Sequence, residues 1–144
     1  MVREAVNHDL GGMLKLYTHL HVDEEPVLID GMISVWKRMI EDPDHHVIIY
    51  EKDGEAVSSC VCVIIPNITR SVRPYAVIEN VVTHADYRGR GFATACLDYA
   101  RELARKAGCY KIMLMTSAKD EAAQNLYRSA GYNSEDKTAF VQWL

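Results

Sequence analysis

Apolar and polar positions along this chain follow two periods, one typical of strands and one typical of amphipathic helices. Apolar runs with strand periodicity predict strands over residues 2–6, 45–51, 55–65, 75–83, 110–115 and 138–143. Apolar residues three or four positions apart predict helices from residue 7 or 8 to about 21, and over 31–41, 92–107 and 120–130. Asp53-Gly54 predicts a hairpin turn, and Asp30 is a predicted N-cap for the second helix. This order indicates a single mixed α/β domain over residues 1–144.

Composition narrows the class of protein. The chain has 144 residues, of which 49% are hydrophobic, so one domain with a sizeable core is expected. No run approaches the roughly 18 apolar residues of a membrane span, and no basic stretch precedes an apolar block at the N-terminus. We therefore expect a cytoplasmic protein without a membrane partner. The net charge of −4 argues against nucleic acid as a partner.

The cysteines and histidines do not have the spacing of a metal site. Cys60 and Cys62 are separated by one residue, which differs from the usual spacing of zinc ligands, so buried thiols are the favoured interpretation. His19 and His21 are two positions apart on the predicted first helix and face different directions. We expect no bound metal.

The glycine-rich segment after the predicted strand 75–83 carries the clearest chemical signal. Arg88-Gly89-Arg90-Gly91 leads directly into a predicted helix that begins at Phe92. The first N–H groups of a helix have no intrahelical acceptor, and glycines let a ligand approach the backbone. With two arginines beside them, these groups predict a pocket for a phosphate or pyrophosphate. The alternative is a tight turn with two solvated arginines.

Two common phosphate motifs do not match this segment. The chain contains no G-x-x-x-x-G-K-[ST] string, which excludes a P-loop of that form. A dinucleotide-binding fingerprint needs a third glycine where this chain has Thr94, and an acidic residue about where it has Lys111.

A third pattern does match. Arg88, Gly91 and Ala93 fill Arg/Gln-x-x-Gly-x-Gly/Ala, and the block from Asn125 to Tyr132 follows about 35 residues later. Together they resemble the acetyl-CoA turn and the L-Y-x-x-x-G-[FY] block of the GNAT superfamily of N-acetyltransferases. This resemblance implies an α/β fold with a mixed, mostly antiparallel sheet of six or seven strands and about four helices, split around acetyl-CoA. It implies that the cofactor is bound by Val82, Thr83, His84, Arg88, Gly89, Arg90, Gly91, Phe92, Ala93 and Thr94.

Two residues are candidates for the chemistry of acetyl transfer. Glu79 is a carboxylate in an apolar strand, and strand alternation predicts that it shares a face with Val81 and Thr83. It is our candidate base for an alkylammonium substrate, the alternative being a surface glutamate on a half-exposed strand. Tyr127 matches the tyrosine that protonates the leaving thiolate in the resembled family. The alternative for Tyr127 is a core tyrosine on an amphipathic helix.

The sequence contains weaker indications of which amine accepts the acetyl group. Residues 77–82 and 108–114 resemble segments of the glucosamine-phosphate N-acetyltransferases, although Asp120 stands where many relatives have an asparagine that contacts the cofactor. A phosphate on the acceptor would need cations, which Arg70 and Arg73 offer if they are not simply solvated. The remaining candidates for lining the acceptor cleft are His19, His21, Glu24 and Glu25.

The sequence therefore predicts an acetyl-CoA-dependent N-acetyltransferase for a small amine. We expect a homodimer, with Trp36 and Trp143 in the core or at the dimer contact. Two alternatives stay open. One is acetylation of a protein N-terminus or lysine, and the other is a non-catalytic acetyl-CoA-binding module.

Overall fold

The computed structural model describes residues 1–21 and 28–144, and a five-stranded sheet lies at its centre. The strand order is β1-β2-β3-β4-β5, with antiparallel pairing between all neighbours except β4 and β5, which are parallel. The strands are β1 (Val2–Glu4), β2 (His45–Lys52), β3 (Glu55–Ile65), β4 (Tyr75–Thr83) and β5 (Ile112–Leu114).

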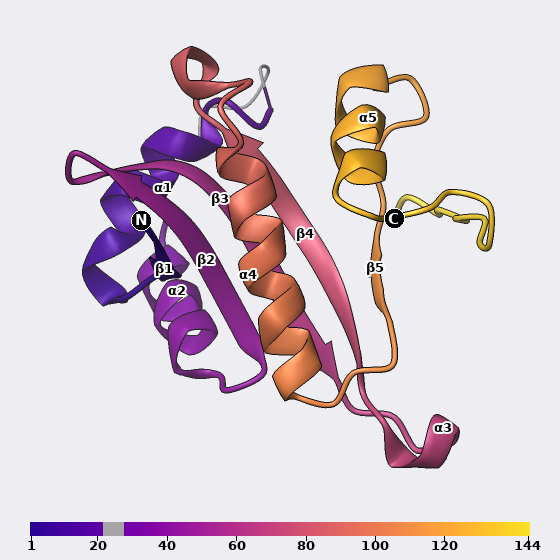
Figure 1. The fold of residues 1–144 in the computed structure, drawn as a ribbon. Helices are drawn as coiled ribbons and strands as arrows, with labels where there is room; N and C mark the ends of the chain where they lie inside the picture. The colour runs from indigo at the N-terminus through magenta and orange to yellow at the C-terminus, as the bar shows by residue number, and fades with distance from the viewer. Residues whose placement is uncertain (22–27) are drawn as a thin grey trace.

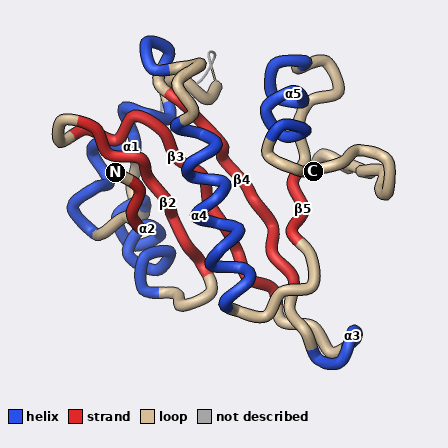
Figure 2. Tube along the Cα trace, viewed as in Figure 1, coloured by secondary structure: helices blue, strands red, loops and turns tan. Residues whose placement is uncertain are grey.

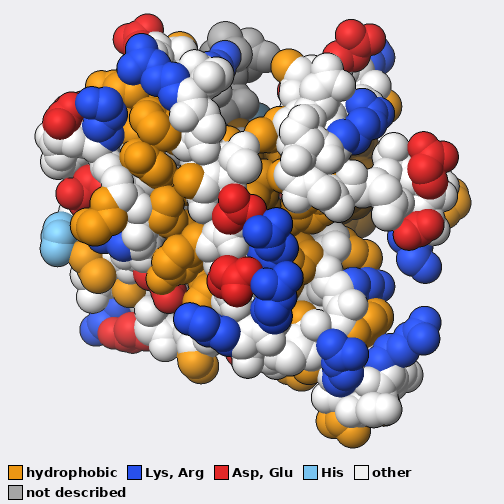
Figure 3. All heavy atoms as spheres, in the orientation of Figure 1, with side chains coloured by type: hydrophobic (Ala, Val, Ile, Leu, Met, Phe, Trp, Pro, Cys, Tyr) orange, Lys and Arg blue, Asp and Glu red, His pale blue; other side chains and the backbone are white. Residues whose placement is uncertain are grey.

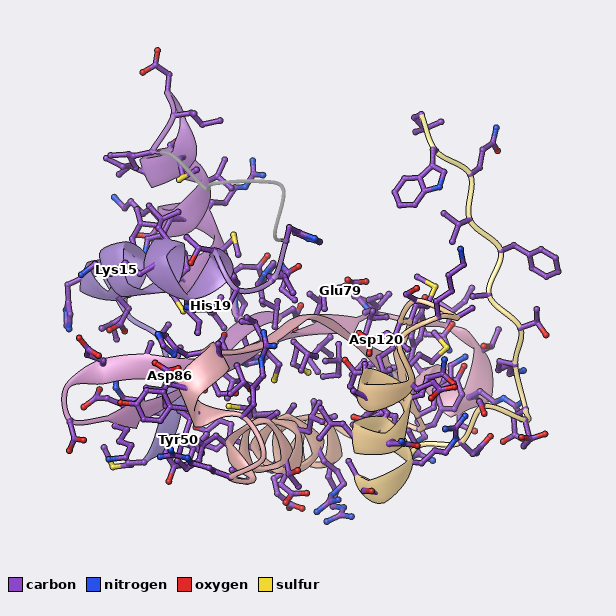
Figure 4. The ribbon with its side chains drawn as sticks, turned by 90° about the horizontal axis from the view of Figure 1, so that it is seen from above. Lys15, His19, Tyr50, Glu79, Asp86 and Asp120 are labelled. Carbon is purple, nitrogen blue, oxygen red and sulfur yellow. The ribbon has the colours of Figure 1, made fainter. Side chains whose placement is uncertain are left out.

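Helices cover both faces of this sheet (Figures 1 and 2). The helix α4 packs against one face together with α5, and α1 and α2 lie on the opposite face, as the edge-on view in Figure 4 shows. The α-helices are α1 (Leu10–Tyr17), α2 (Met32–Glu41), α3 (Thr69–Val72), α4 (Phe92–Lys106) and α5 (Glu121–Ser129), and single 3₁₀ turns cover Asn7–Asp9 (η1) and Ala85–Tyr87 (η2).

Two apolar cores follow from this layering. Ile48, Cys60 and Ile78 point toward α4, where they meet Cys96 and Leu97. The intervening strand residues point the other way and pack against α1 and α2. Strands with helices on both faces bury both sets of alternate side chains, which explains why the middle of β2 and β3 is continuously buried.

The outer surface of α4 is charged. Ion pairs three residues apart join Arg101 to Asp98 at 2.9 Å and Arg105 to Glu102 at 2.6 Å. Lysine, arginine and acidic side chains gather in the centre of the face shown in Figure 3. The predicted amphipathic helix is therefore confirmed, with its apolar stripe on the sheet.

The mixed, mostly antiparallel α/β fold is confirmed, and five strands are found in the described residues instead of six or seven. The predicted strand 138–143 is wrong: this segment has no regular structure and Trp143 is 92% exposed. A strand forms only against a partner, and none of the strands in the described ranges pairs with this segment. Trp36, by contrast, is buried in the core as expected.

Several element limits also differ from prediction. The first helix is shorter, because η1 replaces its first turn and α1 ends at Tyr17, and the first strand ends at Glu4. The N-cap of α2 is Gly31 in a left-handed conformation, so Asp30 was a wrong assignment. The connection between the predicted strands 55–65 and 75–83 contains the single turn α3, in which Arg70 and Ser71 have left-handed backbone conformations.

The cysteines behave as structural residues. Cys60, Cys62 and Cys96 are buried and free, whereas Cys109 is partly exposed, so the prediction of buried thiols holds for three of the four. Burial raises the pKa of the Cys62 and Cys96 thiols to about 12, so both are neutral at physiological pH. No helix within the described ranges combines the length and apolarity that crossing a membrane requires.

Candidate active site

The turn before α4 adopts a backbone that favours glycine. Gly89 has a φ of 72° and Gly91, the N-cap of α4, has a φ of 78°. Residues with a side chain rarely adopt this left-handed backbone conformation, which explains why glycine occupies both positions. No atom lies within 4 Å of the position that a Cβ would take at either residue, so the space above the turn is open.

Six consecutive amides of this turn have no hydrogen-bond partner in the described part of the chain. The first N–H of the region bonded within the helix is that of Ala95, which donates to the Gly91 carbonyl at 3.0 Å. The amides of residues 89–94 precede it, and no acceptor for them is found among the described residues. These donors and the positive end of the α4 dipole converge on the open space, which suits a phosphate or pyrophosphate.

The two arginines of the turn have different surroundings. The Arg88 guanidinium donates to the Thr83 carbonyl at 3.2 Å and to the His19 carbonyl at 3.4 Å. It therefore fastens the end of β4 to the segment that follows α1. The Arg90 guanidinium lies 5.3 Å from the Tyr87 ring centroid and is exposed, so it is available to an anion on the turn.

A row of aromatic rings supports the turn from beneath. Phe92 stacks on Tyr50 of β2 with 4.2 Å between ring centroids and 20° between planes. The row continues through Tyr87 and His84 to His19, whose ring lies 4.1 Å from that of His84. Sequence patterns alone do not single out Tyr50, because its contact with Phe92 joins residues far apart in the chain.

His19 is thus brought to the cofactor turn, although it lies beyond α1 and not on it. Partial desolvation, and then the nearby His84, lower the pKa of His19. Nδ1 of the His84 ring accepts a hydrogen bond from the Asp86 amide at 3.2 Å, which fixes the orientation of this ring beside His19.

A β-bulge interrupts β4 beside Glu79. Glu79 pairs with Val61 of β3 and Val82 pairs with Ser59, so two residues of β4 oppose Cys60 alone. Asn80 in the bulge has a φ of 51°, a conformation that asparagine tolerates better than most residues.

The bulge reverses the alternation of side chains after Glu79. Val82 packs in the core on the α1 side, together with Val61, the partner of Glu79. Val81 packs on the opposite, α4 side. The predicted grouping of Glu79 with Val81 and Thr83 is therefore wrong, because an inserted residue shifts the period of two by one.

Past the bulge, β4 has an unpaired edge. The ladder between β4 and β5 ends at Ile78 and Leu114, whereas β4 continues to Thr83. Figure 1 shows β4 and β5 diverging from this point toward the end of the sheet that carries the α4 turn. The backbone groups of β4 that face this edge between Glu79 and Thr83 have no strand partner among the described residues, so they are free to contact a bound molecule.

The residues at the end of β4 are partly engaged within the protein. The His84 amide donates to the Val57 carbonyl at 2.9 Å, so it is not free for a ligand. The Ser58 hydroxyl lies 2.9 Å from the Val82 carbonyl and 2.8 Å from the Thr83 hydroxyl. These contacts hold the strand end rigidly beside the turn.

Glu79 and Tyr127 approach this unpaired edge from β4 and α5. Glu79 is exposed on the side of the sheet that carries α1. Tyr127 packs partly against the core on the α4 side, and its ring meets that of Tyr132 edge-on at 6.2 Å. Burial raises the pKa of the Tyr127 hydroxyl, and the charges of Asp120 and Glu79 add to this shift. Tyr127 is therefore protonated at neutral pH, and the negative charge of Glu79 is one of the groups that favour this protonated form.

Asp120 has a structural partner. Its carboxylate accepts a hydrogen bond from the Ala123 amide at 2.9 Å and caps α5. Figure 4 places Asp120 near Glu79, at the beginning of the helix that carries Tyr127. The aspartate at this position thus fixes the first turn of α5.

The other predicted acceptor residues do not gather at Glu79. Arg73 donates to the carbonyls of Gly108 and Cys109, both at 3.1 Å, and Arg70 lies over the Tyr110 ring at 5.7 Å. Both arginines precede β4, at the opposite end from the turn, as the position of α3 in Figure 1 shows. His21 is exposed near His19 in the chain, whereas Glu24 and Glu25 lie outside the described residues.

The site thus combines an open row of amides at a helix start, an unpaired strand edge, a carboxylate and a neutral tyrosine. A family model described as "Acetyltransferase (GNAT) family" matches residues 13–132. The chain belongs to the GNAT acetyltransferase family. Arg88, Gly91 and Ala93 and the block from Asn125 to Tyr132 both lie inside the matched range.

Individual GNAT relatives agree with this assignment. A putative acetyltransferase from Agrobacterium tumefaciens has a solved structure that is 35% identical, covers 100% of this chain and 99% of its own, and superposes with a TM-score of 0.94. A glucosamine 6-phosphate N-acetyltransferase from Trypanosoma brucei brucei is 32% identical over 91 residues, which is 63% of this chain and 60% of that protein. An uncharacterized N-acetyltransferase from Methanocaldococcus jannaschii is 29% identical over 150 residues, covering 99% of this chain and 64% of its own. This GNAT chain therefore spans roughly three fifths of the length of the curated relatives it matches.

Proposed function

We propose that this protein is an acetyl-CoA-dependent N-acetyltransferase that acetylates the primary amine of a small molecule. The observation that carries the proposal is the row of free amides at residues 89–94, together with the unpaired edge of β4 that precedes it in the chain. A pyrophosphate fits the amides and the open space above Gly89 and Gly91. An extended chain attached to that pyrophosphate would run along the β4 edge toward Glu79.

Acetyl-CoA, when bound, supplies a thioester whose acyl carbon is open to attack by an amine. Glu79 takes a proton from the ammonium group of the acceptor, directly or through water, because only the free amine is a nucleophile. A free N–H of the β4 edge donates to the acyl oxygen as negative charge develops on it. With acetyl-CoA bound, the C–S bond would break once the amine nitrogen has bonded to the acyl carbon. The Tyr127 hydroxyl would give its proton to the departing sulfur, whose thiol has a pKa of about 8.5 by analogy with cysteine, and the second proton lost by the acylated nitrogen would restore the tyrosine.

The arrangement of these groups matters as much as their acidity. Glu79 belongs to β4 and Tyr127 belongs to α5. Both elements pack against the apolar core on the α4 side of the sheet, β4 through Ile78 and α5 through Leu126 and Tyr127. Holding an amine against a thioester in this frame replaces a bimolecular encounter with an effectively unimolecular step. Positioning therefore contributes more to the rate than either proton transfer alone.

We further propose that the acceptor carries a phosphate, on the basis of the name of the Trypanosoma relative and the likeness of residues 77–82 and 108–114 to the amino-sugar-phosphate enzymes. Within one copy, Arg70 and Arg73 lie too far along β4 to serve that phosphate beside Glu79. A cytoplasmic location and a homodimer remain predictions from the sequence.

Calorimetric titration with acetyl-CoA tests the cofactor site. Gly91→Val should weaken binding at least tenfold, because its side chain enters the space above the free amides, and Arg88→Ala should weaken it less. Gly31→Val is the matched control, since Gly31 is also a left-handed N-cap, with a φ of 83°, but begins α2. Unchanged affinity in folded Gly91→Val, or an equal loss in both valine variants, would sink the assignment.

A further inference from the structure

The bulge beside Glu79 contains a backbone conformation that needs support. Asn80 has a φ of 51° although it lies inside a strand. Val81 packs with Cys60 in the core on the α4 side, so Asn80 is the inserted residue. A residue with a side chain keeps a left-handed conformation inside a strand only where its surroundings hold it there. A neighbouring group must therefore stabilise Asn80.

The end of α1 lies against this part of the sheet. Tyr17 is the last residue of α1, and its ring packs against the α1-side core that contains Val61 and Val82. Val61 is the register partner of Glu79, and Val82 follows the bulge on the same face. The helix contacts both β3 and β4, and Figure 4 shows it on the side of the sheet where Glu79 lies. Tyr17 thus approaches the bulge from the face that exposes the candidate base.

The hydroxyl of Tyr17 is buried without a hydrogen bond. Its oxygen is closed to solvent, and no group in residues 1–21 and 28–144 completes a hydrogen bond of ordinary geometry with it. An unpaired buried hydroxyl costs free energy, and native proteins contain few of them. A polar side chain close to this hydroxyl would remove that cost by completing the bond.

The carboxamide of Asn80 is such a side chain. Burial raises the pKa of Tyr17 to about 12 and the Cys60 thiol adds to the increase, whereas the approach of the Asn80 side chain to the hydroxyl opposes it. A carboxamide can accept a hydrogen bond from the hydroxyl or donate one to it. Asn80 is exposed, so rotation of its carboxamide does not disturb the packed core.

We propose that Tyr17 is a positioning residue, whose hydrogen bond with the Asn80 carboxamide fixes the bulge and so directs the Glu79 carboxylate toward the acceptor. The bond satisfies the buried hydroxyl and holds the left-handed residue at the same time. Without it, Asn80 relaxes toward an ordinary strand conformation, and Glu79 turns away from the face on which it is exposed. The effect on Glu79 rests on the proposed acetyl transfer, whereas the hydrogen bond itself does not.

Tyr17 and Tyr127 have different tasks. Tyr127 packs on the α4 side of the sheet, whereas Tyr17 packs on the α1 side. The Tyr17 oxygen is closed to solvent, so it does not meet a bound molecule directly. Its high pKa also keeps it protonated, so its own ionisation does not alter the rate at moderately alkaline pH. Tyr17 acts through Asn80.

Unfolding of the free protein tests the hydrogen bond. Tyr17→Phe removes the hydroxyl and keeps the ring, and Asn80→Gly removes the carboxamide while permitting the left-handed backbone. In denaturant, Tyr17→Phe should destabilise the chain that contains Asn80 and should not destabilise the Asn80→Gly chain. Equal losses in both backgrounds, or no loss in either, would overturn the bond.

The side-chain NH2 signals of Asn80 in ¹H–¹⁵N spectra give a second measurement on the free protein. They should shift in Tyr17→Phe and stay in place in Tyr75→Phe, which alters a half-buried tyrosine at the other end of β4. Signals that do not move in Tyr17→Phe would contradict a hydrogen bond between the two side chains.

Rates of amine acetylation test what the bond does for Glu79. Tyr17→Phe should lower kcat at pH 7 about tenfold with unchanged acetyl-CoA affinity, and the loss should disappear at high pH, where the amine needs no base. Tyr75→Phe should match wild type throughout. A loss that persists at high pH, or an unchanged rate at pH 7, would refute the positioning role. If wild type acetylates no amine, the proposed function fails and the positioning role fails with it, while the unfolding comparison still decides whether the bond exists.

Discussion

Glu79 is the residue on which the proposed chemistry depends most. It lies on β4 directly before the bulge at Asn80, exposed and on the face where an acceptor can approach from the α1 side. Any displacement of the bulge would turn this carboxylate toward the other face of the sheet. Its proposed role as the base therefore requires both its acid–base chemistry and the unusual backbone of its neighbour.

Replacing Glu79 by glutamine keeps the shape of the side chain and removes its basicity. We expect kcat/KM for amine acetylation at pH 7 to fall about 10²–10⁴-fold, with acetyl-CoA affinity unchanged. Activity should recover at high pH, where the amine is already deprotonated. Wild-type rates at pH 7 would show that Glu79 is not the base.

Tyr127 should contribute more modestly. Tyr127→Phe removes the proton donor but keeps the ring that packs against the core, so kcat should fall about 10–10²-fold without complete loss. Tyr132→Phe is the control, because its ring contacts Tyr127 edge-on and occupies the same region. Steady-state rates at saturating acetyl-CoA make the comparison, and equal effects of the two changes would argue against a role for the Tyr127 proton.

At the scale of elements, the sequence predicted the middle of the sheet well. The strands 55–65 and 75–83 and the start of the helix at Phe92 were located correctly, because their periodicity and turn residues are local signals. The bulge at Asn80 was missed, since it depends on pairing with β3, which is distant in the chain. The grouping of Glu79 with Val81 failed for that reason alone.

The chain entering α1 offers a prediction about stability. The Asp9 carboxylate accepts two hydrogen bonds from the Arg3 guanidinium, at 2.7 and 2.9 Å, and one from the Val6 amide at 2.7 Å. The pairing with Arg3 is the main cause that lowers the pKa of Asp9 below its ordinary value of 3.8. A depressed folded-state pKa contributes stability that is present above the unfolded pKa and is lost as pH falls through the folded pKa.

Asp9→Asn should therefore lower the free energy of unfolding by about 1–2 kcal/mol at pH 7. The difference from wild type should shrink below pH 3.8 as Asp9 becomes protonated. Denaturant unfolding at pH 7 and near pH 3 provides the measurement. Asp53→Asn is the control, because Asp53 is exposed in its pair with Lys52 and should have little effect. If the variant's loss in free energy of unfolding were the same at pH 7 and near pH 3, the proposed contribution of the Asp9 carboxylate would be contradicted.

At the scale of the whole molecule, short sequence motifs were enough to identify the family, but they located only part of the candidate site. The turn at residues 88–93 and the block at 125–132 identify the family without any knowledge of packing. They do not reveal that Arg88 bonds backbone carbonyls, or that Arg73 lies at the far end of β4. Those facts arise from contacts between distant segments. The expected last strand failed for a related reason, since strand formation depends on pairing with a distant segment, and no strand among the described residues pairs with this one.

Thiol release from acetyl-CoA in the presence of small amines tests the central claim most directly. The panel pairs glucosamine 6-phosphate with glucosamine, and an aminoalkylphosphonate with the matching alkylamine, and product mass confirms each N-acetylation. We expect release that requires the amine and matches the acetylated product mole for mole. The phosphorylated or phosphonate partner should react at least about tenfold faster, as a charge-assisted contact of about 1.5–3 kcal/mol predicts. Equal rates within both pairs would contradict the proposal that the acceptor carries a phosphate. Binding of acetyl-CoA with no amine-dependent release from any member of the panel would contradict the proposed acetylation of small amines.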